Sequence, residues 1–293
     1  TVTSCNLTRD LEVDTLGSAD IDIGETIGES YIRVYLITVQ NGIRDRTPLG
    51  TILVQTQSHG FDGMKGTSSF DGYTPLIELK EKPPPLGYYT PKDSVIMNAA
   101  YSLVNTYARA PVVKATDDST LYRDFVANTD DTWVTYVSDL IANAKFYLDL
   151  DELGRILFAP KQDVQSLRPV WTYDDGNSSI LYPEVTYERD LYGIPNVVEV
   201  IYSDEHDYYA ARVVNDDVNS PISTINRGRE IPYRVSNPEF SGIPTQVMVE
   251  QYAEQTLRDI STIECTISYT HGYCPVRIGD CVRLNYERAN LID

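Results

Sequence analysis

The chain has 293 residues, 42% of them hydrophobic and 23% charged, which is long enough for two or three globular domains. Its 24 basic and 43 acidic residues leave a net charge of −19. Such a charge repels phosphate, so sequence-independent binding of nucleic acid is disfavoured, and no motif for sequence-specific binding is seen. No run of residues approaches the ~18 apolar residues of a membrane span, so no direct membrane segment is expected.

The N-terminal residues, TVTSCNLTRDLEVD, alternate and are polar, which indicates a strand and not a signal peptide. Both ends of the chain are expected to be trimmed from a longer protein. The four cysteines (Cys5, Cys265, Cys274 and Cys281) are too sparse and uneven for a disulfide framework, which favours a reduced, cytosolic state. The 22 tyrosines against six phenylalanines suit half-buried sheet faces, since tyrosine has an apolar ring and a polar tip.

Residues 1–57 are predicted to form an N-terminal β-barrel-like domain. Strands are expected at residues 19–23, 31–39 and 49–54. Asn41-Gly42 is a hairpin signal, because both residues tolerate a positive φ. Short strands separated by glycine turns are typical of a small antiparallel barrel or sandwich.

Residues 58–170 are predicted to form an α+β domain with two helices and a hairpin. Glycines are expected to interrupt its first part, at Gly60, Gly63, Gly66 and Gly72. The first helix is expected to start near residues 93–94 and to end before Pro111. The second is expected to be capped at residues 128–129, with Asp130 and Asp131 in its first turn. A hairpin is expected to follow, from residue 146 to residue 158.

Residues 171–293 are predicted to form a second β domain with one helix. Strands at 197–202 and 208–214 are expected to pair, and Thr245 is expected to cap a helix. The alternating strand 262–270 is expected to turn Cys265 towards a core. The fold class is therefore mainly β with an α+β insert, in the order β, α+β, β along the chain.

No motif for catalysis or cofactor binding is present. The sequence lacks the dinucleotide-binding glycine motif, the phosphate-binding loop, the serine nucleophile elbow and the zinc-protease helix motif. The chain has three histidines, and His59 and His206 are expected in solvated loops. We therefore predict no catalytic residue and no cofactor.

His271-x-x-Cys274, with Cys265 and Cys281 nearby, is the best candidate for a metal site. Structural zinc sites use paired knuckles of two ligands each, and that pairing is missing, so no metal is predicted. Asp149-x-Asp151 and Asp20-x-Asp22 both depart from the calcium-loop pattern at the fifth position. Helix caps and turns account for these acids, and the sequence does not place two carboxylates for glycoside hydrolysis.

Six short segments follow one another in an order shared with one family. They are LGTILV at 49–54, YTPKD at 89–93, DTW at 131–133, LDELGRI at 150–156, YGIPNVV at 192–198 and IGDCV at 278–282. Each is a weak signal, and together they span residues 49–282, which is most of the chain. On these segments the chain resembles the baseplate-hub, or tail-tip, proteins of tailed bacteriophages and prophages.

The resemblance implies a homotrimer in the virion tail, assembled in the bacterial cytoplasm. It also implies two small antiparallel β-barrel-like domains per subunit, flanking or intertwined with the α+β domain, and two similar barrels would give a pseudo-six-fold ring that matches the hexameric tail tube. The second barrel would then be truncated at its C-terminal end, or would share strands with the first barrel or with residues 184–214. The implied partners are the distal tail or tail-tube protein, the tape-measure protein and the tail fibre or spike proteins. The implied acidic inner channel would let DNA pass. Ile27-Gly28-Glu29 before one strand echoes Ile278-Gly279-Asp280 before another, as two related barrels would.

Two other functions stay open at this point. One is a tail-associated cell-wall or polysaccharide hydrolase, and the other is a carbohydrate-binding receptor module. For a scaffold, exposed arginines are reasonable interface residues, and the candidates are Arg33, Arg212, Arg227 and Arg229. Each of them is equally well explained as ordinary surface charge.

Overall fold

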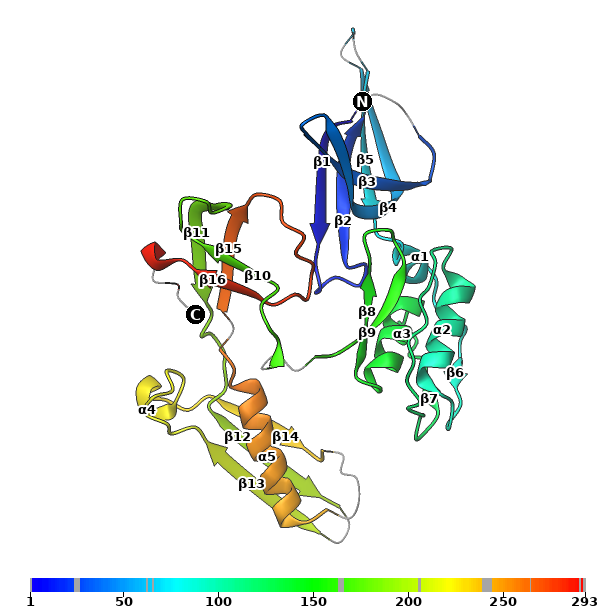
Figure 1. The fold of residues 1–293 in the computed structure, drawn as a ribbon. Coiled ribbons are helices and arrows are strands. Elements are labelled where there is room, and N and C mark those ends of the chain that lie inside the picture. The colour runs from blue at the N-terminus through cyan, green and yellow to red at the C-terminus, as the bar shows by residue number, and fades with distance from the viewer. Residues whose placement is uncertain are drawn as a thin grey trace. The chain divides into compact units, whose positions relative to one another are not determined.

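A computed structural model describes residues 2–23, 27–61, 63–64, 66–162, 166–204, 207–238, 244–263, 265–289 and 291. The chain is mainly β with an α+β insert, as predicted (Figure 1). It forms two compact units, Thr1–Val170 with Val276–Cys281 and Trp171–Pro275 with Val282–Asp293. Within the described ranges, no helix is both long and apolar enough to cross a membrane.

The first unit begins with a curled antiparallel sheet of five strands in the order β1-β2-β5-β4-β3 (Figure 1). The strands are β1 (Val2–Arg9), β2 (Gly17–Ile23), β3 (Tyr31–Gln40), β4 (Ile43–Phe61) and β5 (Gly66–Tyr73). Alternation turns Ala19, Ile21 and Ile52 into a small core on one face. The predicted strands at 19–23, 31–39 and 49–54 are confirmed.

The Asn41-Gly42 hairpin is also confirmed. These two residues have φ values of 52° and 78°, and they join Gln40 of β3 to Ile43 of β4 across the turn. Two successive positive φ values match the right-handed twist of the flanking strands.

The glycines after residue 58 do not interrupt the structure as predicted, because Gly66 and Gly72 lie in β5. A Cβ at Gly72 would overlap the Ile52 side chain and lie 2.9 Å from the Leu53 carbonyl oxygen. This glycine therefore lets β4 and β5 approach closely. The predicted division at residue 57 falls inside β4, whose far half pairs with β5.

The α+β part of the first unit packs its helices against a hairpin. Its elements are α1 (Ile77–Lys80), β6 (Tyr89–Thr90), α2 (Ile96–Tyr107), β7 (Phe125–Val126), α3 (Trp133–Ala142), β8 (Phe146–Leu150) and β9 (Ile156–Pro160). Trp133 is the centre of an aromatic cluster: it stacks on Tyr107 with ring centroids 4.4 Å apart and meets Tyr88 edge-on at 4.9 Å. This core is the largest in the chain's described part.

The start of α3 differs from the prediction. Thr132 caps the helix: its side chain accepts from the Thr135 N–H at 3.4 Å, and the Thr135 hydroxyl accepts from the Thr132 N–H at 2.8 Å. The predicted cap at residues 128–129 is wrong because Asp131 accepts a hydrogen bond from the Asn128 N–H at 2.8 Å and closes a turn before the helix.

The second unit contains a three-stranded sheet covered on one face by a helix (Figure 1). Its elements are β12 (Val197–Ser203), β13 (Tyr208–Val214), α4 (Thr224–Arg227), β14 (Pro232–Ser236) and α5 (Gln246–Ile260). Val249, Ala253 and Leu257 of α5 pack on Val198 and Val200 of β12. The predicted pairing of β12 with β13 and the Thr245 cap of α5 are confirmed.

Two further strand pairs complete the second unit. They are β10 (Trp171–Asp174) with β16 (Val282–Asn285), parallel, and β11 (Leu181–Arg189) with β15 (Cys265–His271), antiparallel; the short helix η2 (Glu287–Ala289) follows β16. The alternation predicted for β15 is present, but Cys265 is exposed, so the prediction that it faces a core is wrong. It is the first residue of the strand, and its Sγ lies 3.2 Å from the Tyr187 hydroxyl oxygen.

Candidate interaction surfaces

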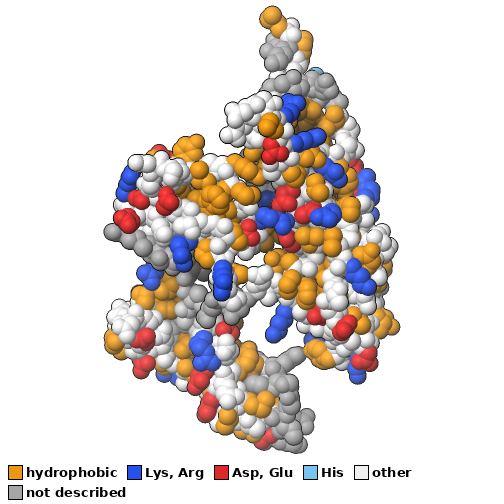
Figure 2. Space-filling view, in the orientation of Figure 1, with side chains coloured by type: hydrophobic (Ala, Val, Ile, Leu, Met, Phe, Trp, Pro, Cys, Tyr) orange, Lys and Arg blue, Asp and Glu red, His pale blue; other side chains and the backbone are white. Residues whose placement is uncertain are grey.

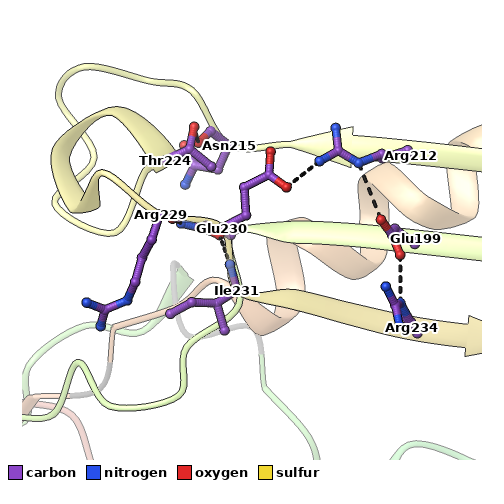
Figure 3. Close-up of polar contacts among 9 residues, drawn as sticks. Glu199, Arg212, Asn215, Thr224, Arg229, Glu230, Ile231 and Arg234 are labelled. Carbon is purple, nitrogen blue, oxygen red and sulfur yellow. Dashed lines mark hydrogen bonds and ion pairs between the residues drawn. The ribbon is translucent and has the colours of Figure 1, made fainter.

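A row of charges crosses the face of the three-stranded sheet that α5 leaves uncovered. The register places Arg212 of β13 and Arg234 of β14 on either side of Glu199 of β12. Arg234 Nε lies 2.8 Å from one carboxylate oxygen of Glu199, and Arg212 Nε lies 3.4 Å from the other (Figure 3). Arg212 also reaches Glu230 at 2.6 Å. Residues directly opposite on neighbouring strands share a face, so this register alone aligns the charges.

The charges of this row shift each other's pKa. The hydrogen bond from Arg234, together with the charges of Arg234 and Arg212, holds the pKa of Glu199 below its ordinary value. Glu230 and Glu199 in turn raise the pKa of Arg212. Both shifts favour the charged forms of Glu199 and Arg212. Paired guanidinium and carboxylate groups on a flat face are suited to meeting a complementary protein surface.

Asn196, which is fully buried, holds the loops at the edge of this sheet together. Its side-chain amide donates to the Ile222 carbonyl at 3.1 Å and to the Arg229 carbonyl at 3.0 Å. Its side-chain oxygen accepts from the Ile231 N–H at 2.7 Å. The three bonds use both amide hydrogens and the oxygen, so one side chain fixes the loop between β13 and β14.

In the sequence, Asn196 is part of the YGIPNVV segment, for which no anchoring role was predicted. The sequence does carry a signal: the asparagine stands directly before two valines, after the turn-forming Gly193. The structure shows Gly193 with a φ of 70° and both valines buried. A polar residue at the entrance of a buried strand needs partners, and those partners come from distant segments.

The four arginines proposed as interface residues have different environments. Arg212 belongs to the charge row. Arg227 supports the fold, because it donates to the Ile194 carbonyl at 2.9 Å and to the Leu191 carbonyl. Arg229 is exposed, and its side chain points away from the charge row (Figure 3). Arg33 is exposed on β3. Only Arg33 and Arg229 of the four have a guanidinium without a polar partner in the described part of the chain.

The IGDCV segment has a structural role in the first unit. Residues 276–281 return to this unit, where Arg277 lies 2.7 Å from Glu152 and donates to the Leu150 carbonyl at 3.2 Å. Asp280 accepts from the Arg277 N–H at 2.8 Å, and Gly279 has a φ of 85° in the same turn. These residues form a clip on the β8–β9 hairpin. Of the IGDCV segment, only Val282, the first residue of β16, lies in the second unit.

A second ion-pair group joins the sheet to the helices within the first unit. The buried carboxylate of Glu78 in α1 accepts from the Arg109 backbone N–H at 2.6 Å and pairs with the Arg109 side chain. Arg109 also reaches Glu29, just before β3, at 3.0 Å. Burial and the nearby Glu78 raise the pKa of Tyr31, so its phenol stays protonated. The group holds the start of β3 against α1.

The His271–Cys274 candidate forms a hydrogen-bonded cluster with a buried tyrosine. The Tyr173 hydroxyl lies 2.9 Å from Cys274 Sγ and 3.3 Å from His271 Nε2. His271 Nδ1 lies 2.6 Å from the Gly272 carbonyl oxygen and donates to it. Burial and the Cys274 thiol raise the pKa of Tyr173. Cys281 belongs to the first unit, and no three His, Cys, Asp or Glu side chains converge as metal ligands among the described residues.

The remaining acids and histidines occupy turns and strands. Asp151 accepts from the backbone N–H groups of Leu153 and Arg155, at 3.0 and 2.7 Å, and so closes the β8–β9 turn. His59 lies in β4 and not in a loop as predicted, with Nδ1 2.9 Å from the Ser68 hydroxyl. His206 lies outside the described residues.

Comparison with known proteins finds likeness in structure and not in sequence. No protein-family model and no curated protein matches the chain. A tail protein from Neisseria meningitidis MC58 aligns over 94% of this chain and 79% of its own, with a TM-score of 0.64 and 16% identity. The 43 kDa tail protein of prophage MuSo2 from Shewanella oneidensis aligns over 98% and 85%, with a TM-score of 0.62 and 13% identity.

A third tail protein extends the likeness. Prophage tail protein gp18 from Listeria monocytogenes EGD-e aligns over 97% of this chain and 79% of its own, with a TM-score of 0.51 and 10% identity. The chain has the fold of phage and prophage tail proteins. The likeness covers nearly the whole chain, so both compact units belong to the tail-protein fold. At such low identity the shared feature is the fold, and function must be argued separately.

Proposed function

We propose that the chain is a structural hub of a phage tail, a homotrimer that joins the hexameric tail tube to the spike or receptor-binding apparatus. The observation that carries the proposal is the alignment of 94% of the chain with a Neisseria tail protein at a TM-score of 0.64. The distal tail or tail-tube protein and the tape-measure protein would lie on one side, and the fibre or spike proteins on the other.

The surface chemistry supports a scaffold. The Glu199 charge row is a set of ion pairs on a sheet face and is suited to recognising another protein surface. The net charge of −19 would let DNA pass through an exit channel without being retained on its wall, because phosphates are repelled. On this proposal the chain does no chemistry, and it acts in the virion tail after assembly in the bacterial cytoplasm.

Two measurements test the proposal. Sedimentation velocity over a wide range of protein concentration should show a trimer, and labelled antibody against the chain should mark one end of purified tails in electron micrographs. Labelling along the tube, or none at all, would contradict the hub position. Incubation with peptidoglycan and capsular polysaccharide should release no soluble fragments, and steady release of fragments would favour a tail-associated hydrolase instead.

A further inference from the structure

One face of the β3–β4 hairpin carries arginines and apolar side chains without a carboxylate. The register places Ile37 opposite Arg46 and Val39 opposite Arg44, so each pair shares a face. Alternation along β3 adds two more residues to the same face. We call this set the arginine face: Arg33, Tyr35, Ile37, Val39, Arg44 and Arg46. Asp45, the one acid of the hairpin tip, pairs with Thr38 on the opposite face.

The arginine face is open to solvent and its charges are unpaired. Arg33, Arg44 and Arg46 are all exposed, and Ile37 and Val39 are 48% and 67% exposed. The Arg46 guanidinium lies 3.7 Å from the centroid of the Tyr35 ring, which holds it in place. None of the three arginines has an ion-pair partner among the described residues. Figure 2 shows basic side chains gathered over the N-terminal sheet.

The three arginines stay without an ion pair although the chain has 43 acidic and only 24 basic residues. Other arginines in the described part of the chain do pair with acids, as Arg109, Arg212 and Arg277 do. A cluster of arginine, tyrosine and exposed aliphatic side chains has the composition of a protein interface centre. The aliphatic side chains favour a protein partner over nucleic acid, whose backbone offers them no apolar contact.

The outer face of the β11–β15 ribbon has the opposite charge. Glu188 shares this face with Thr266, and Thr186 shares it with Ser268. Glu184 lies in the register shift just before the regular pairing begins at Val185 and is exposed, as is Glu188. Neither carboxylate has an ion-pair partner within the described ranges. Both edges of this ribbon lack a neighbouring strand in the described structure, so the ribbon is accessible to another chain.

We propose that the arginine face of one copy docks on Glu184 and Glu188 of β11 in a second copy. The inference rests on the homotrimer proposed above and names the contact that builds it. Arg33 and the Ile37–Arg46 pair are four positions apart along β3, as Glu184 and Glu188 are along β11, about 13 Å in each case. The contact joins two different surfaces, so it is head-to-tail and closes into a ring when the rotation between copies allows.

Charge reversal tests the contact on the full chain. Arg44→Glu with Arg46→Glu, and separately Glu184→Arg with Glu188→Arg, should each weaken self-association on the order of tenfold in sedimentation velocity at low salt. An equimolar mixture of the two variants should restore association between unlike copies, because every contact between the two variants joins surfaces of opposite charge. A ring of three keeps one repulsive contact between like copies, so mixed pairs and not closed trimers are expected to recover. This recovery also shows that both variants are folded. Arg123→Glu with Arg229→Glu, the same charge change on arginines outside the face, should leave association unchanged.

The outcomes separate the contact from the hub proposal. A trimer that keeps its affinity in both reversed variants would overturn the contact and leave the homotrimer standing. A wild-type chain that stays monomeric at every concentration would count against both. A DNA duplex that binds wild type and not Arg44→Glu with Arg46→Glu, with self-association unaltered, would assign the arginine face to a polyanion and overturn the proposal.

Discussion

Asn196 accepts the backbone N–H of Ile231 at 2.7 Å, and through this bond a residue at the entrance of β12 fixes the start of β14. The same side chain donates to carbonyls of the intervening loop, so three hydrogen bonds converge on a fully buried group. Buried polar groups are costly to leave unpaired, and here the partners are backbone atoms that have no substitute.

Asn196→Ala should therefore destabilise the second unit strongly. Removing the side chain leaves one N–H and two carbonyls without partners, for an expected cost of about 2–4 kcal/mol. Denaturant unfolding would give the total, and hydrogen exchange should show faster exchange in β12 and β14 than in the first unit. Asn219→Ala, in the exposed loop, is the matched control and should cost less than about 0.5 kcal/mol. Equal costs for the two variants would contradict the anchoring role.

The start of α3 gives a second prediction. Thr132→Ala removes the observed cap and should cost about 1 kcal/mol, because one N–H of the first turn loses its partner. Thr129→Ala, at the cap expected from sequence, should be nearly neutral. Thermal unfolding of the two variants decides between the positions: a larger loss of stability for Thr129→Ala would place the functional cap at residue 129.

The two Ile-Gly-acid segments should respond differently to the same substitution. Gly279 has a φ of 85°, so Gly279→Ala should cost about 1–2 kcal/mol and loosen the clip on the β8–β9 hairpin. Gly28 lies outside the left-handed region and has no atom near its Cβ position, so Gly28→Ala should be neutral or slightly stabilising. Equal effects, measured by denaturant unfolding, would mean that the two segments share a conformation after all.

The Glu199 charge row predicts a pH dependence. Since Arg234 and Arg212 hold the pKa of Glu199 below the ordinary 4.5, this carboxylate contributes stability above pH 4.5 and loses it as pH falls through the lowered folded value. A carbon-detected NMR titration should show the lowered pKa in wild type and a higher one in Arg234→Gln. Arg229→Gln, which leaves the row intact, should not change it. An unchanged Glu199 pKa in Arg234→Gln would show that the hydrogen bond is not made in solution.

The elements that could be predicted from the sequence are those governed by neighbouring residues. Asn41-Gly42 specifies its turn because both residues accept a positive φ, and Thr245 specifies the start of α5 because a hydroxyl there reaches the free N–H of Met248. The pairing of β12 with β13 follows from two short alternating runs separated by a polar turn. The order of weak family segments also indicated the tail-protein fold, which the structural neighbours bear out.

Where two local signals competed, the sequence misled. Asn128 and Thr129 are good cap residues, but Asp131 closes a turn at Asn128. The helix therefore begins after Thr132, which caps it together with Thr135. Gly66 and Gly72 are residues that commonly form turns, but here they lie in β5. The neighbouring strand β4 approaches so closely that a larger side chain at these positions would crowd it. In each case the conformation was set by a contact that the pattern of neighbouring residues does not reveal.

The sequence by itself thus determined the strand-rich class, the local turns and the positions of the amphipathic helices, because dihedral preference and alternation act over a few residues. Only the tertiary structure decided which groups Asn196 and Arg277 contact, and that Arg33, Arg44 and Arg46 share one face of the β3–β4 hairpin. The partners of Asn196 lie 26 to 35 residues away, and the Leu150 carbonyl lies 127 residues from Arg277. The two Ile-Gly-acid segments at Gly28 and Gly279 illustrate this difference. Their sequences are similar but their backbone conformations differ, because long-range packing and not the local segment sets the φ angles of the two glycines.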